Sequence, residues 1–305
     1  MEAKLNFKPI HFNWVAIHPQ PIGIIHFIGG AFFGTFPTVF YRYLLKQLFQ
    51  QGYTIAALPF RFTFRHWSVA ISLVRDRERL RQGIIAEAKR LGYQYRIYEQ
   101  EPISPHPNHF WLAHSLGCKY IALLELLTEL EQREIREFLG DCVGSKQAAA
   151  LEDSLRGVDL EDISLKNQPS ILLAPVIAGI ESAVPIPALA NLSKKLGLDV
   201  QPTVRETRCL IERSRLFGLT AALAFGNDRI ASNPELDSDG EPKGTVEWLQ
   251  KHLPTIKFSE LPNRGHLAPL GFRYGNRQII GKVVELLAQE TQQLKSILSQ
   301  AERSA

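Results

Sequence analysis

The sequence has no long hydrophobic run. Its longest apolar stretch, residues 171–180, is about ten residues long and contains Pro175, whereas a membrane-spanning helix needs roughly 20 apolar residues. The N-terminal sequence MEAKLNFKPIHFNW also lacks a continuous apolar stretch of signal-peptide length. We therefore expect a protein with no integral membrane span, located in the cytoplasm.

The sequence also has little net charge. Its 35 Lys and Arg residues against 31 Asp and Glu residues give a net charge of +4, which is too small to indicate a nucleic-acid partner without a concentrated basic patch. The densest basic stretch, residues 75–81, is interleaved with Asp76 and Glu78 and has helical periodicity. A solvated helix face explains this stretch better than a nucleic-acid site does.

Cysteine is scarce, since the chain contains only Cys118, Cys142 and Cys209. Their odd number and the absence of metal-ligand spacing favour a reducing compartment, and no metal site is expected. We expect Cys118 to be a small buried residue, not a nucleophile.

Of the 305 residues, 45% are hydrophobic and 22% are charged. This composition is sufficient for a packed core and a solvated surface. There is no internal repeat. Short apolar runs alternate with helix-periodic stretches, which predicts a mostly parallel sheet covered by helices. The expected strands are residues 12–18, 22–28, 53–59, 109–113, 170–174, 219–225 and 256–261, and the expected helices are residues 37–50, 69–91, 117–131, 244–253 and 276–299. The apolar face of the first helix contains Val39, Phe40, Tyr43, Leu44 and Leu48.

Two stretches interrupt this alternation. Residues 132–168 are polar and helical, and residues 177–216 are rich first in proline and then in charge. Loops of this length inside a compact domain are usually functional, and neither stretch holds enough apolar residues for a core of its own. We therefore expect one domain over residues 1–305, with two helical cap insertions over one face.

Ser115 is the candidate nucleophile. It lies in Ala113-His114-Ser115-Leu116-Gly117, between an expected strand and an expected helix. A strand–nucleophile–helix elbow presents a serine in a strained turn, and small residues are needed two positions before and after it, where strand and helix approach closely. The alternative is a serine that caps the helix. His114 is expected to pack and to form hydrogen bonds, not to act as a base.

A glycine-rich loop follows the strand expected at residues 22–28. Its sequence is Gly29-Gly30-Ala31-Phe32-Phe33-Gly34. Paired glycines let the backbone turn sharply and direct N–H groups into a site, so we predict an oxyanion hole formed by the N–H groups of Ala31 and Leu116. A phosphate-binding loop is the alternative, but the G-x-G-x-x-G spacing and a lysine are missing.

Asp228 and His266 complete the candidate site. Asp228 follows the strand expected at residues 219–225, and His266 follows the strand expected at residues 256–261. The carboxyl ends of parallel strands are where such sheets place their ligands. Asp228 is preferred to the acidic residues that follow it, Glu235, Asp237 and Asp239, because these lie in a polar loop farther from the strand.

The order Ser115, Asp228, His266, with the Gly-Gly-Ala loop and His-Ser-Leu-Gly, resembles the α/β-hydrolase superfamily across essentially the whole chain. The combination of GGAFFGTFP, LPFRFTFRH and AHSLGCK is similar to one branch of this superfamily. That branch is found in cyanobacteria and chloroplasts and is catalogued as a domain of unknown function. The resemblance implies the α/β-hydrolase fold and a hydrolase-type site. The loop also resembles the His-Gly-Ala loop of plant carboxylesterases, with Gly29 in place of the histidine.

These features predict an esterase-, lipase- or thioesterase-like serine hydrolase that needs no metal and no organic cofactor. Two alternatives remain: a non-catalytic protein that uses the pocket for binding or assembly, and an acyltransferase with the same triad. Phe32, Phe33 and Phe36 lie in the glycine-rich loop and are candidates to line an apolar substrate pocket, although they could simply pack the cap onto the body. Arg61, Arg65 and His66 end a strand near the same edge and could bind a carboxylate, but structural or solvated roles are preferred.

Overall fold

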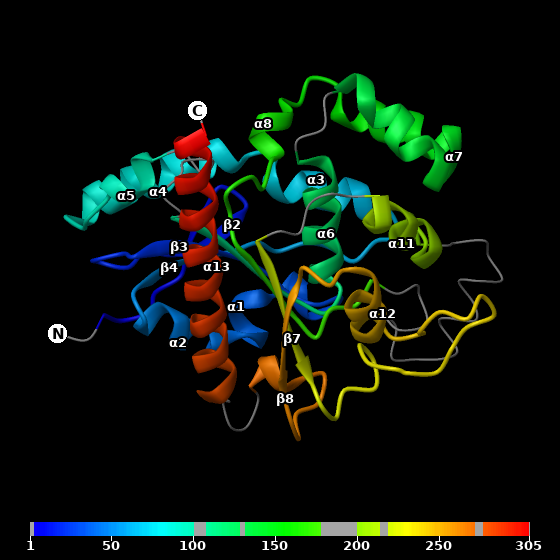
Figure 1. Cartoon of the computed structure of the whole chain (residues 1–305). Helices are drawn as coiled ribbons and strands as arrows, with labels where there is room; N and C mark the ends of the chain where they lie inside the picture. The colour runs from blue at the N-terminus through cyan, green and yellow to red at the C-terminus, as the bar shows by residue number, and fades with distance from the viewer. Residues whose placement is uncertain are drawn as a thin grey trace.

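The computed structural model describes residues 3–100, 108–128, 132–177, 200–213, 219–271 and 277–304. Its centre is a sheet whose described strands follow the order β1-β2-β4-β3-β5-β6-β7-β8 (Figure 1). Strands β3 to β8 pair in parallel, and a short antiparallel hairpin, β1–β2, adds to the edge at β4. The strands are β1 Lys8–Ile10, β2 Asn13–Ala16, β3 Gly23–Ile28, β4 Tyr53–Ala57, β5 His109–His114, β6 Ser170–Leu173, β7 Thr220–Phe225 and β8 Lys257–Leu261.

The sheet is mostly parallel and flanked by helices, so the expected fold class is confirmed. Strand β3 is buried along its whole length, as expected for a parallel sheet covered on both faces. The edge hairpin was only partly foreseen, because residues 12–18 read as one strand and β1 is three residues long.

Helices cover both faces of the sheet. Alternate residues of a strand point to opposite faces, and Ile24 and Ile28 of β3 belong to one hydrophobic cluster while Ile25 and Phe27 belong to the other. The first cluster includes residues of α3 His66–Val74, α4 Arg77–Leu91, α6 Gly117–Leu127 and α8 Leu160–Ile163, and the second includes residues of α2 Arg42–Gln50 and α13 Arg277–Ser304. The remaining helical elements are η1 Phe33–Thr35, α1 Pro37–Phe40, α5 Arg96–Glu99, α7 Gln132–Leu155, α11 Val204–Arg213, α12 Thr245–His252 and η2 Ala268–Leu270.

Two expected helices are interrupted. The helix expected over residues 37–50 divides at Tyr41, whose φ of −106° and ψ of 17° separate α1 from α2. The prediction that Val39 lies on the buried face is therefore wrong, since Val39 is 65% exposed and Tyr41 is fully buried. The reason is that the helical period does not continue across the break. The helix expected over residues 69–91 also divides, at Arg75 and Asp76, into α3 and α4.

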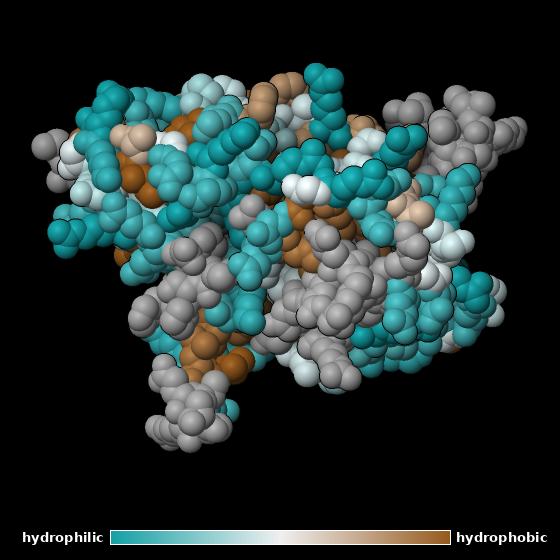
Figure 2. Space-filling view, turned by 90° about the horizontal axis from the view of Figure 1, so that it is seen from above, coloured by the Kyte–Doolittle hydropathy of each residue, from teal (hydrophilic) through white to brown (hydrophobic). Residues whose placement is uncertain are grey.

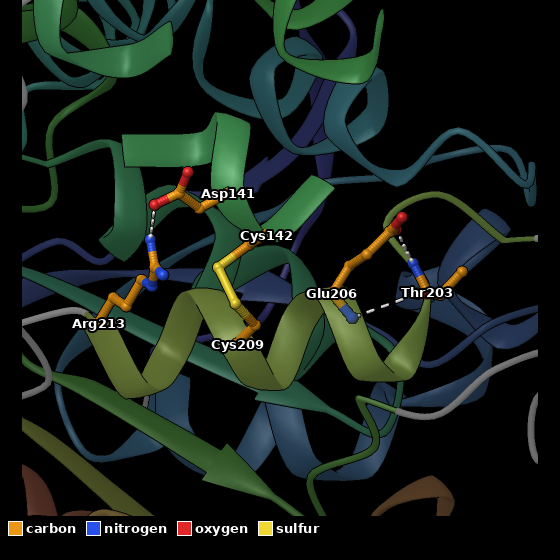
Figure 3. The surroundings of a disulfide bond; sticks show 6 residues. All are labelled: Asp141, Cys142, Thr203, Glu206, Cys209 and Arg213. Carbon is orange, nitrogen blue, oxygen red and sulfur yellow. Dashed lines mark hydrogen bonds and ion pairs between the residues drawn. A yellow bond between two sulfur atoms is a disulfide. The ribbon is translucent and has the colours of Figure 1, made fainter. Parts of the chain in front are cut away.

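The two insertions meet at a disulfide bond. Helix α7 belongs to the first insertion and α11 to the second, and Cys142 of α7 is bonded to Cys209 of α11 with an S–S distance of 2.03 Å (Figure 3). An ion pair between Asp141 and Arg213, at 2.8 Å, lies beside it. The odd number of cysteines is therefore no indication of a reducing compartment, because two of the three are bonded to each other across a sequence separation of 67 residues.

Helix α7 packs against α3 and α11, and α11 also contacts α6. Residues 178–199 and 214–216 of the second insertion lie outside the described residues. The face that carries α4 and α7, at the top of Figure 1, is mostly hydrophilic (Figure 2). Within the described ranges, every helix is too short or too polar to act as a transmembrane segment.

Candidate active site

Ser115 lies in a sharp turn between β5 and α6. Its φ of 55° is in the left-handed region, which a residue with a side chain adopts only at a cost. The turn brings α6 against the end of β3, because a Cβ on Gly117 would lie 2.6 Å from the carbonyl oxygens of Ile28 and Gly29. A larger residue at position 117 would therefore separate helix and strand. The structure thus has the elbow geometry that the sequence predicts.

Ser115, His266 and Asp228 form a continuous hydrogen-bonded row. His266 Nε2 lies 2.8 Å from Ser115 Oγ, and His266 Nδ1 lies 2.8 Å from Asp228 Oδ2. Asp228 Oδ1 accepts hydrogen bonds from the N–H groups of Ile230 and Ala231, at 2.8 and 3.0 Å. An ionised carboxylate only accepts, so Nδ1 of the neutral imidazole carries the proton and Nε2 is free to accept the proton of the serine.

The carboxyl of Asp228 is held ionised. Its side chain has no exposed surface, and burial by itself raises the pKa of the carboxyl. The hydrogen bond from His266, the positive charge that this ring carries once it is protonated and the two backbone N–H groups outweigh burial and hold the pKa below its usual value. Asp228 is therefore a carboxylate at neutral pH, as an orienting acid must be.

The acidic residues that follow Asp228 have other partners. They form ion pairs with basic side chains, at 3.0 Å for Glu235 with Lys243, 3.4 Å for Asp237 with Arg208, and 3.6 Å for Asp239 with Arg205. Asp228 is the residue that the fold places at the imidazole, where β7 and β8 end side by side.

The glycine-rich loop passes beside the serine. A Cβ on Gly30 would lie 3.1 Å from Ser115 Cβ, a tight contact, so the loop backbone approaches Ser115 closely because residue 30 is glycine. Among the hydrogen bonds of the described residues, the N–H groups of Ala31 and Leu116 take no partner. An oxyanion hole requires unused N–H donors of this kind near the reacting serine.

A buried chain of hydrogen bonds links this loop to His266. Gly30 N–H donates to Tyr41 Oη at 2.7 Å, Tyr41 Oη lies 2.8 Å from His114 Nδ1, and His114 Nε2 lies 2.8 Å from the carbonyl oxygen of His266. A carbonyl only accepts, so His114 Nε2 carries the proton, His114 Nδ1 accepts, and the Tyr41 hydroxyl donates to it. One assignment of protons satisfies all three bonds.

Both side chains of this chain of hydrogen bonds stay uncharged. Burial, with a smaller contribution from the charge of His266, lowers the pKa of His114 to about 3. Burial also raises the pKa of the Tyr41 hydroxyl above its usual range. His114 is therefore a neutral hydrogen-bonding residue, and Tyr41 holds the backbone of the glycine-rich loop at Gly30. Helical periodicity gave no signal for Tyr41, because it lies at the break between α1 and α2.

Phe32 begins a row of aromatic side chains beside the loop. It is 44% exposed and stacks on Phe62 with ring centroids 5.0 Å apart, and Phe62 packs edge-to-face on Phe64 at 5.6 Å. Both Phe62 and Phe64 contact Val200, which is buried at the described end of the second insertion. We refer to Phe32, Phe62, Phe64 and Val200 as the aromatic wall.

The other two candidate pocket residues are placed differently. Phe33 packs on Phe40 and on the hydrophobic cluster of the α2 and α13 face, whereas Phe36 is 61% exposed.

The three candidate carboxylate-binding residues, Arg61, Arg65 and His66, differ in burial. Arg61 and Arg65 are exposed, and Arg65 forms a β-bridge with Gln201 of the second insertion. His66 is 1% exposed and packs edge-to-face on Tyr120. Across the described ranges, no group of three or more His, Cys, Asp and Glu side chains is arranged to hold a metal ion.

Comparisons with known proteins agree with this architecture. Residues 6–156 match a family model described as a protein of unknown function, DUF1350. Among solved structures, the apo form of Thermogutta terrifontis esterase 2 is 14% identical, with a TM-score of 0.51 over 95% of this chain and 96% of that chain. The same esterase phosphonylated by sarin gives the same values, and the form phosphonylated by cyclosarin gives 13% identity and a TM-score of 0.50 over 95% of both chains. No curated protein matches the sequence.

Proposed function

We propose that this chain, which has the α/β-hydrolase fold expected from its sequence, is a serine hydrolase that cleaves an ester-type bond through an acyl-enzyme on Ser115. The observation that carries the proposal is the row Ser115–His266–Asp228, with both of its hydrogen bonds at 2.8 Å. The unused N–H groups of Ala31 and Leu116 support it, because they flank the nucleophile.

The reaction follows from these positions. His266 Nε2 takes the proton of the Ser115 hydroxyl as Oγ attacks the carbonyl carbon of the ester, and Asp228 stabilises the imidazolium that forms. The N–H groups of Ala31 and Leu116 bind the oxyanion of the tetrahedral intermediate. His266 then gives its proton to the leaving alcohol. Water repeats the sequence on the acyl-enzyme, which releases the acid and restores Ser115.

We further propose that the ester is a small molecule with an apolar acyl group. The aromatic wall begins at Phe32, next to Ala31, and small-molecule sites are mostly apolar with a few polar anchors. Each methylene buried against such a wall contributes roughly 0.8 kcal/mol. A pocket of this kind therefore selects for acyl chain length.

The second insertion closes this side of the site in our proposal. Gln201 is bound to the segment that leads into α3 by two backbone hydrogen bonds, Gln201 N–H to Phe64 O at 2.7 Å and His66 N–H to Gln201 O at 2.8 Å. The fully buried Lys119 donates to the carbonyl of Pro202 at 2.6 Å. The first insertion would act through its disulfide to α11. Both would then be caps of a single domain, not domains of their own.

Labelling with a fluorophosphonate tests the proposal without knowledge of the substrate. Peptide mass analysis should place the adduct on Ser115, and Ser115→Ala should abolish labelling while it leaves the thermal midpoint nearly unchanged. A folded wild-type protein that forms no adduct would instead favour the non-catalytic binding protein. An adduct accompanied by transfer of the acyl group to an added alcohol in preference to water would favour the acyltransferase.

A further inference from the structure

A cavity lies on the α3 and α4 face of the sheet. Its volume is about 300 Å³. Asn13 of the edge hairpin, together with Ser72 and Arg75 at the break between α3 and α4, lies at its mouth, and the buried residues His26 and Trp111 line it more deeply. The break between the two helices thus leaves a space over strands β3 and β5 that the hydrophobic core does not fill.

His26 presents an unused polar group there. The residue is 2% exposed, its ring stacks on Trp111 at 4.7 Å, and its Nε2 lies 2.8 Å from His109 Nδ1. In the described chain His26 Nδ1 makes no hydrogen bond. Burial, together with the positive charge of Arg77, lowers the pKa of His26 to about 3, so the ring is neutral.

The pairing with His109 indicates where the proton of His26 lies. His109 Nε2 is buried without a partner among the described residues. If His26 Nε2 donated to His109 Nδ1, His109 Nε2 would have to carry a proton and would be a buried, unpaired N–H group, which proteins rarely tolerate. The opposite arrangement avoids this, because His109 Nδ1–H then donates to His26 Nε2. In that arrangement His26 Nδ1–H is an unpaired donor at the cavity.

The charges around the cavity favour an anion. Arg75 lies at its mouth, and Arg77, whose guanidinium donates to the carbonyl oxygens of Ser164 and Glu161 at 2.8 and 3.1 Å, also lines it. The acidic residue in the lining is Asp76, which pairs with Arg79 at 3.4 Å.

We propose that this cavity is a binding site for a small carboxylate with an aromatic or compact aliphatic body. Arg75 and the donors of His26 and Asn13 would bind the carboxylate, and Trp111 and its apolar neighbours would contact the body of the ligand. A cavity of about 150 Å³ holds benzene, so twice that volume suits a ring with a charged group. Trp111 precedes Ser115 by four residues on β5, or about 13 Å at roughly 3.3 Å per residue, so the site is separate from the proposed nucleophile.

Calorimetric titration of the full chain with benzoate, and with benzamide as its neutral counterpart, tests this site. Benzoate should bind at least tenfold more tightly than benzamide. Arg75→Gln should weaken benzoate at least fivefold, whereas Arg90→Gln, which removes the same charge in the last turn of α4 and outside the cavity lining, should change its affinity less than twofold. Equal binding of the two compounds, no binding of benzoate, or an equal loss in both variants would overturn the proposal.

Two further measurements separate the ligand site from the proposed catalytic site. Asn13→Asp changes the charge at the mouth with almost no change in shape, so it should weaken benzoate at least fivefold and leave benzamide unchanged. Benzoate affinity should also be the same in Ser115→Ala as in the wild type. Loss of benzoate binding in Ser115→Ala would instead place the compound at the elbow and refute a second site, whatever the outcome of the labelling experiment.

Discussion

Tyr41 should matter to catalysis even though it does not contact the substrate. Tyr41→Phe removes the hydroxyl that accepts from Gly30 N–H at 2.7 Å and donates to His114 Nδ1 at 2.8 Å. Both partners are buried, so the variant leaves one donor and one acceptor without a partner. The ring itself remains, which preserves its edge-to-face packing on Phe27.

The magnitude follows from those two losses. A buried polar group left unpaired costs about 1–3 kcal/mol. Two such groups, with some adjustment of the structure around them, should lower the free energy of unfolding by about 2–4 kcal/mol. In a chain of this size each kcal/mol lowers the thermal midpoint by roughly 2–4 °C. Gly30 precedes the proposed oxyanion donor, and loss of one such donor lowers kcat by on the order of 10²–10³-fold. A displaced donor should cost less, on the order of 10-fold to 100-fold.

The assay is hydrolysis of a p-nitrophenyl ester at a temperature well below the midpoint of the variant. We expect kcat to fall while KM changes little, because the oxyanion is bound in the transition state and not in the ground state. Tyr43→Phe is the matched control, since Tyr43 lies two residues farther along the chain, in α2, and the described chain gives its hydroxyl no hydrogen bond. A wild-type kcat in Tyr41→Phe, or an equal loss in Tyr43→Phe, would refute the role of the buried chain of hydrogen bonds.

Four further predictions concern the acid, the disulfide and the aromatic wall. Asp228→Asn should lower the rate by on the order of 10⁴-fold, and Asp237→Asn should not; equal losses would mean that the wrong carboxylate is assigned. Because folding lowers the pKa of Asp228, ionisation of this carboxyl adds to the free energy of unfolding above about pH 4. Calorimetry of the wild type should show that this contribution is lost as the pH falls, and Asp228→Asn should show no such contribution. Reduction of Cys142–Cys209 opens a covalent loop with a sequence separation of 67 residues, which the chain-entropy model values at about 4 kcal/mol; an unchanged thermal midpoint would show that the loop is constrained by other contacts. With p-nitrophenyl esters, kcat/KM should rise from acetate to medium chains and Phe32→Ala should flatten the rise, whereas a flat wild-type profile would remove the apolar pocket.

The sequence predicted the sheet, its helices and the positions of Ser115, Asp228 and His266 because each rests on a local signal. Strands are short apolar runs, and residues just after the carboxyl ends of parallel strands meet at one edge of a sheet. The structure brings these three side chains within hydrogen-bond distance. Their chemical roles remain a proposal.

The remaining features depend on contacts between distant segments. Tyr41 lies at a helix break that periodicity cannot show, and it reaches His114 across a separation of 73 residues. His26 and His109 read as isolated polar residues within apolar strands, and only the parallel pairing of β3 with β5 places them together. The cavity likewise arises because α3 and α4 are two separate helices. The continuous helical pattern of residues 69–91 predicts a single helix instead.

The disulfide bond has a consequence for cleavage by proteases. A single cut in the chain between Cys142 and Cys209 leaves the two fragments covalently joined, so the nicked protein separates only after reduction. Ser115 lies on the N-terminal side of this loop, and Asp228 and His266 lie on the C-terminal side. The proposed nucleophile and the proposed base would then belong to different polypeptide fragments of one molecule, still held by the sheet and by Cys142–Cys209.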